Sequence, residues 1–370
     1  MASYVVGPAV LWALLWVSIV VLALQLVLVV GARLSRVHRQ RRDRRRVAPL
    51  RPLLLELASG EEAAVEDVER ALTGAPASTR TVVDEAILQL LGKIRGDSST
   101  ALVDVLRRHG RQQAAVTDLR SRSSVARARA VWTLGVMQER AAVPALLPLL
   151  HDRSPDVALT ATRALGMLGD PAAATPILTA VEPGGSRPGL PAWIAVEAVA
   201  SLGTETAPQV RAALRHHSPD VRRAAAMVIA QVPLVAAAGT LREVITRETE
   251  PRLVSMMVLA LGAVGGPGDT DLLGPLLDEG HDAQIRRAAI GAVAEVGGAR
   301  AVVWLRPLLV SSDIRVAELA ATTLAALGVA GHQAVSAVAE CTVQTTSSRL
   351  CRYAVTQHAL GRSRTTQRAS

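Results

Sequence analysis

The sequence of 370 residues contains no phenylalanine, a single lysine (Lys93) and two cysteines, and aromatic residues make up 2% of it. Because aromatic side chains usually supply much of a buried core, this core must consist of Ala, Leu and Val packed between closely spaced backbones, which helices allow better than sheets. The scarcity of aromatic residues also argues against a surface that stacks nucleic-acid bases. Cys341 and Cys351 lack a CxxC spacing, which excludes a common zinc or redox motif, and their small number agrees with a reducing compartment.

Catalytic and metal-binding motifs are also missing from the sequence. Gly92-Lys93 lacks both the earlier glycine and the following Ser or Thr of a phosphate-binding loop. No His-x-x-x-His pair occurs, and the acidic turn at 278–282 is typical of a solvated turn before a helix. His216-His217 also lies in a turn before a helix, where exposed histidines are common. We therefore predict no catalytic, cofactor-binding or metal-binding residues, no cofactor and no enzymatic activity.

The positive charge is concentrated in two short segments. In total, 41 Lys and Arg against 32 Asp and Glu give a net charge of +9. Residues 349–370 hold five Arg and no acid, whereas the body between 47 and 348 has 28 basic and 31 acidic residues. We expect no nucleic-acid partner, because a protein that binds nucleic acid carries its positive charge on the folded surface. The other basic segment, 33–46, holds eight arginines: Arg33, Arg36, Arg39, Arg41, Arg42, Arg44, Arg45 and Arg46.

A long apolar segment precedes these eight arginines. Ala9–Val30 contains a single amide, Gln25, and no charged residue. As a helix, its 22 residues would reach about 33 Å, enough to cross the hydrocarbon core of a membrane. We predict one transmembrane helix within 1–32. A cleaved signal peptide is the less favoured alternative, because no basic residue precedes the apolar run and an arginine cluster follows it.

The distribution of arginine around this segment predicts an orientation. With no basic residue before the apolar run and eight after it, the positive-inside rule places the N-terminus outside and the rest of the chain in the cytoplasm. The sequence thus predicts a single-pass protein of the plasma (inner) membrane, with residues 33–49 as a basic juxtamembrane linker. The arginines are interpreted as a topology signal that contacts membrane lipids, in preference to a specific site for anionic headgroups.

The body of the chain is repetitive. The tetrapeptide Ser-Pro-Asp-Val occurs at 154–157 and at 218–221, which are two periods of 32 residues apart. Aligning apolar and small residues at offsets 0, 4, 7 and 8 places one apolar stripe on each of seven predicted helices. The anchor residues at offset 0 are Ala126, Val157, Ile194, Val221, Leu253, Ile285 and Val316.

Each anchor helix is followed by a second amphipathic segment, for example at 143–152, 172–181, 271–280 and 301–310. Ser154 and Ser218 are predicted to cap their helices, with a proline in the first turn. Prolines inside the second helices, such as Pro148 and Pro307, are predicted to bend them or shift their starts. Two antiparallel helices per period of about 32 residues predict an α-solenoid.

Asp156–Asp170 (DVALTATRALGMLGD) resembles the signature D-x-V-R-x-x-A-x-x-A-L-G-x-L-G-D of HEAT repeats, in particular the short bacterial kind of the phycobilin lyases. Ala158 replaces the arginine of that signature, whereas Arg222 and Arg286 retain it. The resemblance covers about 126–340. It implies an all-α fold, an α-solenoid of about eight HEAT-type helical hairpins, here preceded by the transmembrane helix. In HEAT families this arginine often pairs with an Asp of a neighbouring repeat, which implies structural links first, and partner recognition second, for Asp156, Asp220, Arg222 and Arg286.

The chain is predicted to divide into five parts. After the membrane helix (1–32) and the linker (33–49), residues 50–122 form a helical cap with degenerate repeats, 123–344 the HEAT-repeat solenoid, and 345–370 a basic, flexible tail. The Pro- and Gly-rich segment 182–191 lengthens one connection. We interpret it as a tolerated insertion in preference to a rim element that contacts a partner.

These features favour a noncatalytic, membrane-anchored scaffold for protein-protein interaction, whose concave row of second helices binds a protein partner. Two alternatives stay open. One is an enzyme or enzyme subunit resembling the phycobilin-lyase group, and the other is an accessory subunit of a membrane enzyme such as a glycosyltransferase.

Overall fold

The computed structural model describes residues 77–93, 100–185, 188–297, 299–340 and 345–369, with isolated residues between 16 and 74. The described elements are helices, and the chain forms two compact units, Met1–Ala114 and Ala115–Ser370. The structure thus divides the chain earlier than the predicted boundary between 122 and 123.

The first unit is described over three helices: α4 (Ala77–Leu91), α5 (Thr100–Arg108) and α6 (Arg111–Asp118), whose end belongs to the second unit. Val83, Ile87 and Leu106 are fully buried. The buried Asp84 side chain lies 2.5 Å from Nδ1 of His109, which ties α4 to the end of α5. These three helices lie within the segment 50–122 that is predicted as a helical cap with degenerate repeats.

The predicted membrane location is wrong. Among the described residues, no helix is long and apolar enough to cross a membrane. The predicted transmembrane helix (1–32) and basic linker (33–49) lie almost entirely outside the described residues, and of the eight arginines only Arg33 is described, as an exposed residue. The predicted contact with membrane lipids consequently has no support.

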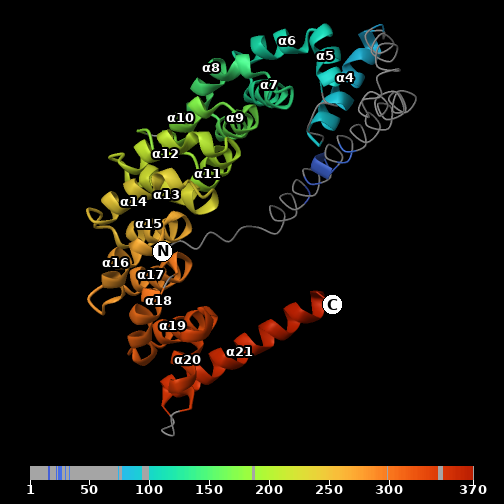
Figure 1. Cartoon of the computed structure of the whole chain (residues 1–370). Coiled ribbons are helices and arrows are strands. Elements are labelled where there is room, and N and C mark those ends of the chain that lie inside the picture. Colours follow the sequence, from blue (N-terminus) through green and yellow to red (C-terminus); the bar gives the residue numbers. More distant parts are fainter. Residues whose placement is uncertain are drawn as a thin grey trace, which may run out of the picture. The chain divides into compact units, whose positions relative to one another are not determined.

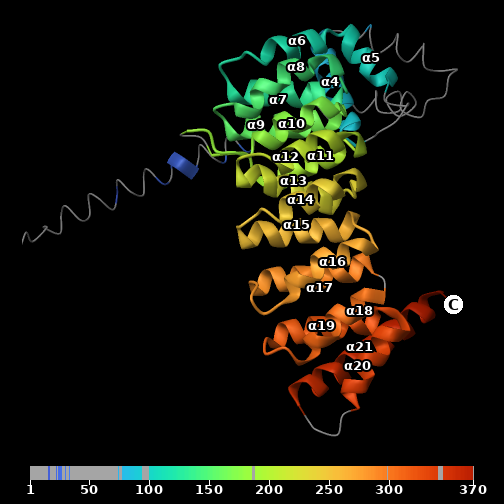
Figure 2. The same cartoon turned by 60° about the vertical axis from the view of Figure 1, so that its left-hand side comes forward.

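The second unit is a stack of helix pairs, as the repeat pattern predicts (Figures 1 and 2). Six of the seven anchor residues are buried near the starts of the first helices, and Ala126 is partly exposed. The first helices are α7 (Ser124–Val136), α9 (Pro155–Leu168), α11 (Ala192–Ser201), α13 (Pro219–Gln231), α15 (Pro251–Val264), α17 (Ala283–Val296) and α19 (Ile314–Ala326). The second helices are α8 (Val143–Leu146), α10 (Ala174–Thr179), α12 (Ala207–Leu214), α14 (Ala238–Ile245), α16 (Thr270–Leu273), α18 (Ala299–Leu305) and α20 (Gly328–Ala339).

Figure 1 shows which layer faces inward in the second unit. The first helices of the pairs lie on the inner, concave side of the arc, and the second helices lie on the outer side. The prediction that the second helices form the concave row is therefore wrong. We refer to the first helices as the inner row.

Consecutive inner helices approach each other at glycine. A Cβ atom added to Gly135 would lie 2.8 Å from Cβ of Ala164, and one added to Gly262 would lie 2.8 Å from Cα of Ala292. Gly166 faces Ala198 in the same way, at 3.0 Å. Such contacts leave no room for a large side chain, because interiors are packed to near-crystalline density. A phenylalanine would not fit at these three contacts.

The second helices are interrupted at proline, as predicted. In three of them the α-helix gives way to a 3-10 turn that contains a proline near its start, because proline lacks the N–H that continues an α-helix. These turns are Leu147–His151 with Pro148, Gly274–Leu277 with Pro275, and Arg306–Val310 with Pro307.

Two local predictions differ from the structure. Neither Ser154 nor Ser218 accepts a capping hydrogen bond through its side chain. At Ser154, the Val157 N–H donates to the Ser154 carbonyl (3.1 Å) and not to the Ser154 hydroxyl. Residues 345–370 are not the predicted flexible tail over most of their length, since Thr346–Ala369 form α21.

Helix α21 packs on α19 and α20 through its first turns. Ser348, Cys351 and Ala354 are buried there, at a spacing of three residues that keeps them on one face. Because the segment is rich in Ser, Thr and Arg, this short buried stripe, which itself begins with a serine, does not stand out in the sequence.

Candidate functional site

Three arginines link consecutive helix pairs. Each directly follows an anchor residue and reaches the residue five places before the next anchor. We call each link an arginine rung. The rungs are Arg127–Asp152 (Nε to Oδ2 2.9 Å, Nη2 to Oδ1 2.7 Å), Arg222–Glu248 (Nε to Oε2 2.9 Å) and Arg286–Ser311 (Nη2 to Oγ 3.0 Å).

The same guanidinium groups also bind backbone carbonyls that lie just before their own helices. Nη1 of Arg222 donates to the carbonyl oxygens of His216 (3.0 Å) and His217 (2.8 Å), and Arg127 makes two equivalent bonds to its own turn. Arg286 donates from Nε to the Leu277 carbonyl at 3.2 Å. Each rung therefore fixes a turn and the following pair at once, with the directional donors that a planar guanidinium provides.

Two of the acceptors are carboxylates whose pKa is lowered. Burial opposes ionisation of Asp152, but hydrogen bonds from Arg127 and from the Ser154 N–H (2.8 Å) outweigh it and hold the pKa of Asp152 below its ordinary value. Burial likewise opposes ionisation of Glu248, and there the N–H groups of Glu250 and Thr249, together with Arg222, lower the pKa. Both carboxylates are therefore charged partners of their rungs at neutral pH.

The four residues singled out from the sequence have different positions. Arg286 is buried and the Arg222 side chain is 20% exposed, so both lie inside the links between pairs. Asp156 is exposed at the start of α9, and Asp220 accepts a hydrogen bond from Arg223 of its own helix (2.8 Å). The acceptors in the rungs are thus residues that precede the helices, which the signature alone did not single out.

The outer helices carry further links that the sequence analysis did not identify. Arg242 binds the buried Asp269 (Nη2 to Oδ2 3.0 Å). This hydrogen bond lowers the pKa of Asp269, and its effect is larger than the opposing effect of burial. Arg215 binds Glu243 of the next pair through Nε at 3.2 Å. Their separations of 27 and 28 residues are close to one repeat, which is the signal that points to them.

One of the positions that lack the rung arginine coincides with a cavity. Ala158 stands where the signature has Arg, and Gly189 stands where the next pair would supply the acceptor. Both residues line a cavity of about 450 Å³, together with Asp152 and Arg153, which correspond to the turn residues whose carbonyls bind Arg222 in its rung. The cavity therefore lies between two pairs where the arginine of a rung would lie.

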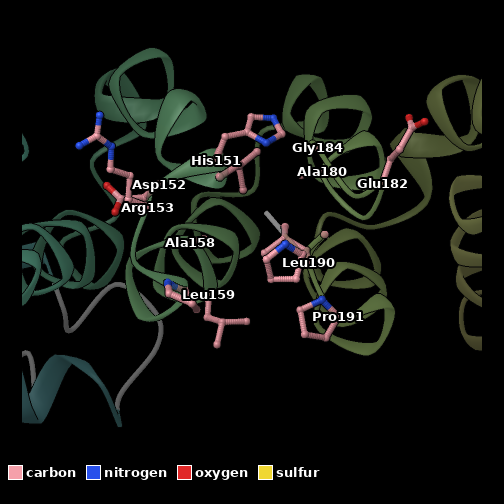
Figure 3. Close-up of a pocket in the computed structure, with 14 residues that line it drawn as sticks. His151, Asp152, Arg153, Ala158, Leu159, Ala180, Glu182, Gly184, Leu190 and Pro191 are labelled. Carbon is pink, nitrogen blue, oxygen red and sulfur yellow. The ribbon is translucent and has the colours of Figure 1, made fainter. Parts of the chain in front are cut away.

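Residues Glu182, Gly184 and 188–191 of the insertion line the other side of this cavity (Figure 3). The loop returns to α10 through a hydrogen bond from the Leu190 N–H to the Ala180 carbonyl (2.8 Å), and Leu190 is buried. Figure 3 shows the Glu182 carboxylate turned away from Leu190. The insertion is thus packed against the solenoid at this point.

Glu182 lies close to His216 and His217, two residues that are distant from it in the sequence. Its Oε1 lies 3.2 Å from Nε2 of His217, and the His216 and His217 ring centroids are 4.1 Å apart. Among the described residues, these three form the one group of three or more His, Cys, Asp and Glu side chains whose ligand atoms all lie within 4.8 Å of one another. The His-His dipeptide was visible in the sequence, but the fold of the insertion, which brings Glu182 to it, was not.

The inner row exposes apolar side chains between the linked pairs. Trp193 of α11 is 55% exposed. The guanidinium carbon (Cζ) of Arg163 lies over its ring, 5.9 Å from the ring centroid. Leu259 of α15 is 49% exposed, and Met227 and Met256 on α13 and α15 are partly exposed. Aromatic and Arg side chains of this kind are enriched where proteins bind one another, and methionine adapts to different partner surfaces.

The stack of linked helix pairs defines the second unit as an α-solenoid. Residues 113–183 and 207–294 match the family of HEAT repeats. These segments include the signature at Asp156–Asp170 that indicates HEAT repeats.

Solved structures with related helical stacks have low sequence identity to this chain. The CpcE–CpcF complex of the phycocyanin lyase from Nostoc sp. PCC7120 is 22% identical (65% of this chain, 91% of that chain, TM-score 0.27). Human deoxyhypusine hydroxylase is 21% identical (80% and 96%, TM-score 0.29), and YibA of Escherichia coli is 15% identical (70% and 95%, TM-score 0.37). We draw no functional conclusion from likenesses at this level. No curated protein shows significant similarity to the sequence.

Proposed function

We propose that the second unit is a noncatalytic scaffold that binds a protein partner along its inner row of helices. The observation that carries this proposal is the exposure of Trp193 and Leu259 on helices whose positions are fixed by the rungs and by glycine contacts. A surface held in one arrangement before binding loses little conformational entropy when a partner docks. HEAT repeats commonly bind protein partners, which supports the same interpretation.

The exposed residues Trp193 and Leu259 lie outside the buried core. Leu259 lies in the middle of an inner helix, and half of its surface faces solvent. An apolar side chain in that position loses water when a partner covers it, which favours binding by about 25 cal/mol per Å² of apolar surface removed from water. The flanking charged residues, such as Arg223 paired with Glu250 (3.2 Å), would form the polar rim of such an interface.

A photocrosslinking amino acid at position 259 or 303 tests the proposal in the cells that produce the protein. Val303 is the matched control, because it is an apolar residue of α18, in the outer row, and is 70% exposed. We expect a discrete protein adduct from position 259 and none of that mass from position 303. Equal adducts from both positions, or no protein adduct from position 259, would contradict the proposal.

A role as an enzyme subunit also requires a protein on this surface. The identity of the crosslinked protein separates the two roles: a subunit is recovered with an enzyme whose turnover depends on this chain, and a scaffold is not.

A further inference from the structure

We propose that Glu182, His216 and His217 form a binding site for one divalent transition-metal ion of the zinc type. The three side chains come from two segments, the start of the insertion and the turn before α13, which the stacking of the pairs brings together. One ligand atom from each lies within 4.8 Å of the others, and Glu182 Oε1 and His217 Nε2 are 3.2 Å apart. Two ligand atoms that each lie about 2.0–2.2 Å from the same ion are separated from one another by distances like those between these three side chains.

Both segments are held in place without a metal. The Arg222 guanidinium binds the carbonyls of His216 and His217, so the rung fixes the backbone of the dipeptide. The hydrogen bond from Leu190 to Ala180 closes the insertion just beyond Glu182. A metal ion would therefore find its ligands close to their final positions, and little ordering of the chain would oppose binding.

One weak hydrogen bond would be exchanged on binding. Nδ1 of His216 accepts from the Ser218 N–H at 3.2 Å. If Nδ1 binds the ion, the metal replaces this donor; if Nε2 binds, the proton moves to Nδ1 and the bond is lost. A neutral hydrogen bond at this distance contributes about 1 kcal/mol or less, which a metal–imidazole bond exceeds.

The chemistry of the ligands selects the class of metal. Two imidazoles and one carboxylate favour Zn²⁺, Co²⁺ or Ni²⁺ over Mg²⁺ and Ca²⁺, which prefer oxygen ligands. The exposure of the His217 side chain, 78%, leaves the remaining coordination positions to water. The site is independent of the proposed protein-binding role.

Titration calorimetry of the full, untagged chain with ZnCl₂ tests this site, with MgCl₂ as the comparison. We expect one Zn²⁺ site that is weakened more than tenfold in Glu182→Gln and in His217→Gln, since changes outside the ligands alone already cost about tenfold or more in affinity. His281→Gln is the matched control, because His281 is an exposed histidine in the equivalent position before α17 and belongs to no such group of three. It should bind Zn²⁺ as the unmodified chain does.

Three results would overturn the proposal. They are equal Zn²⁺ affinity in the unmodified chain and in His217→Gln, an equal loss in His281→Gln, and Mg²⁺ binding at the same site with the same affinity. Because Glu182 and His217 are largely or partly exposed, the variants should retain the helical circular dichroism of the unmodified chain. Visible absorption of the Co²⁺ complex, at roughly 500–650 nm, gives a second measurement. Each ligand variant should reduce this absorption.

Discussion

Replacing Arg222 by alanine removes one rung from the middle of the solenoid. The guanidinium contacts Glu248 through Nε (2.9 Å) and Nη2 (2.8 Å), and its Nη1 donates to the carbonyls of His216 and His217 at 3.0 and 2.8 Å. The variant therefore separates the α13 pair from the α15 pair at one point and also frees the turn before α13.

The expected loss of stability follows from the number and kind of these bonds. A hydrogen bond to a charged group contributes about 1.5–3 kcal/mol, but bonds made by one side chain are not additive. Glu248 keeps two backbone donors, the N–H groups of Thr249 (3.0 Å) and Glu250 (3.2 Å), which partly satisfy its charge. We therefore expect Arg222→Ala to lower the free energy of unfolding by about 2–3 kcal/mol.

Urea unfolding followed by circular dichroism measures this loss, with Arg247→Ala as the matched control. Arg247, just after the end of α14, is 74% exposed and pairs with Glu243 of that helix (2.9 Å), so its removal should cost about 0.5 kcal/mol or less. Arg222→Lys should fall between the two variants, because an ammonium group cannot make all of the guanidinium bonds. If Arg222→Ala is no less stable than Arg247→Ala, the rungs do not hold the pairs together.

Three further predictions address packing, the last helix and pH. Gly262→Ala should lower the free energy of unfolding by about 1–3 kcal/mol because of the tight contact with α17, whereas Gly239→Ala on α14, which meets open space, should raise it by about 0.5 kcal/mol. In a Cys341→Ser background, Cys351 should react with a thiol reagent many times more slowly in the folded chain than in urea, since its burial also raises its pKa. Because folding lowers the pKa of Glu248, protonation of this carboxylate favours the unfolded chain. The stabilisation that Glu248 contributes should be complete above about pH 5 and be lost as the pH falls below about 4. Acid unfolding measures this loss, which should be smaller in Arg222→Ala.

The periodic part of the fold could be predicted from the sequence because each repeat is a local unit. Val157, Val221 and Leu253 each belong to the apolar stripe of their own helix. Stacking of neighbouring pairs buries such stripes. The proline-dependent 3-10 turns follow from the missing N–H, which is also local. Helix α21 was missed because its buried stripe is short and lies in a segment rich in polar residues.

The site depends on contacts that no local pattern contains. The signature arginine indicates that a link exists, but the partner of Arg222 is Glu248, before the next helix, and not the Asp of the signature. The meeting of Glu182 with His217 depends on how the insertion folds back onto the solenoid. A pattern of 32 residues cannot specify the path of a segment that departs from it.

The inner row also could not be assigned from amphipathic patterns. Each helix pair has two apolar faces that meet in the core, and the pattern does not determine which helix of the pair lies inside the arc. Close contacts at glycine occur in both rows, at Gly135 and Gly262 in the inner row and at Gly274 against Trp304 in the outer row. Those contacts become visible when the pairs are assembled.

The affinity of the purified crosslinked partner for Leu259→Asp, measured beside Val303→Asp, tests the central claim most directly. A buried charge at position 259 should weaken binding more than tenfold, about 1.4 kcal/mol or more, while the outer-row variant should bind as the unmodified protein does. Unchanged affinity in Leu259→Asp, or an equal loss in Val303→Asp, would contradict the claim that the inner row of helices binds the partner.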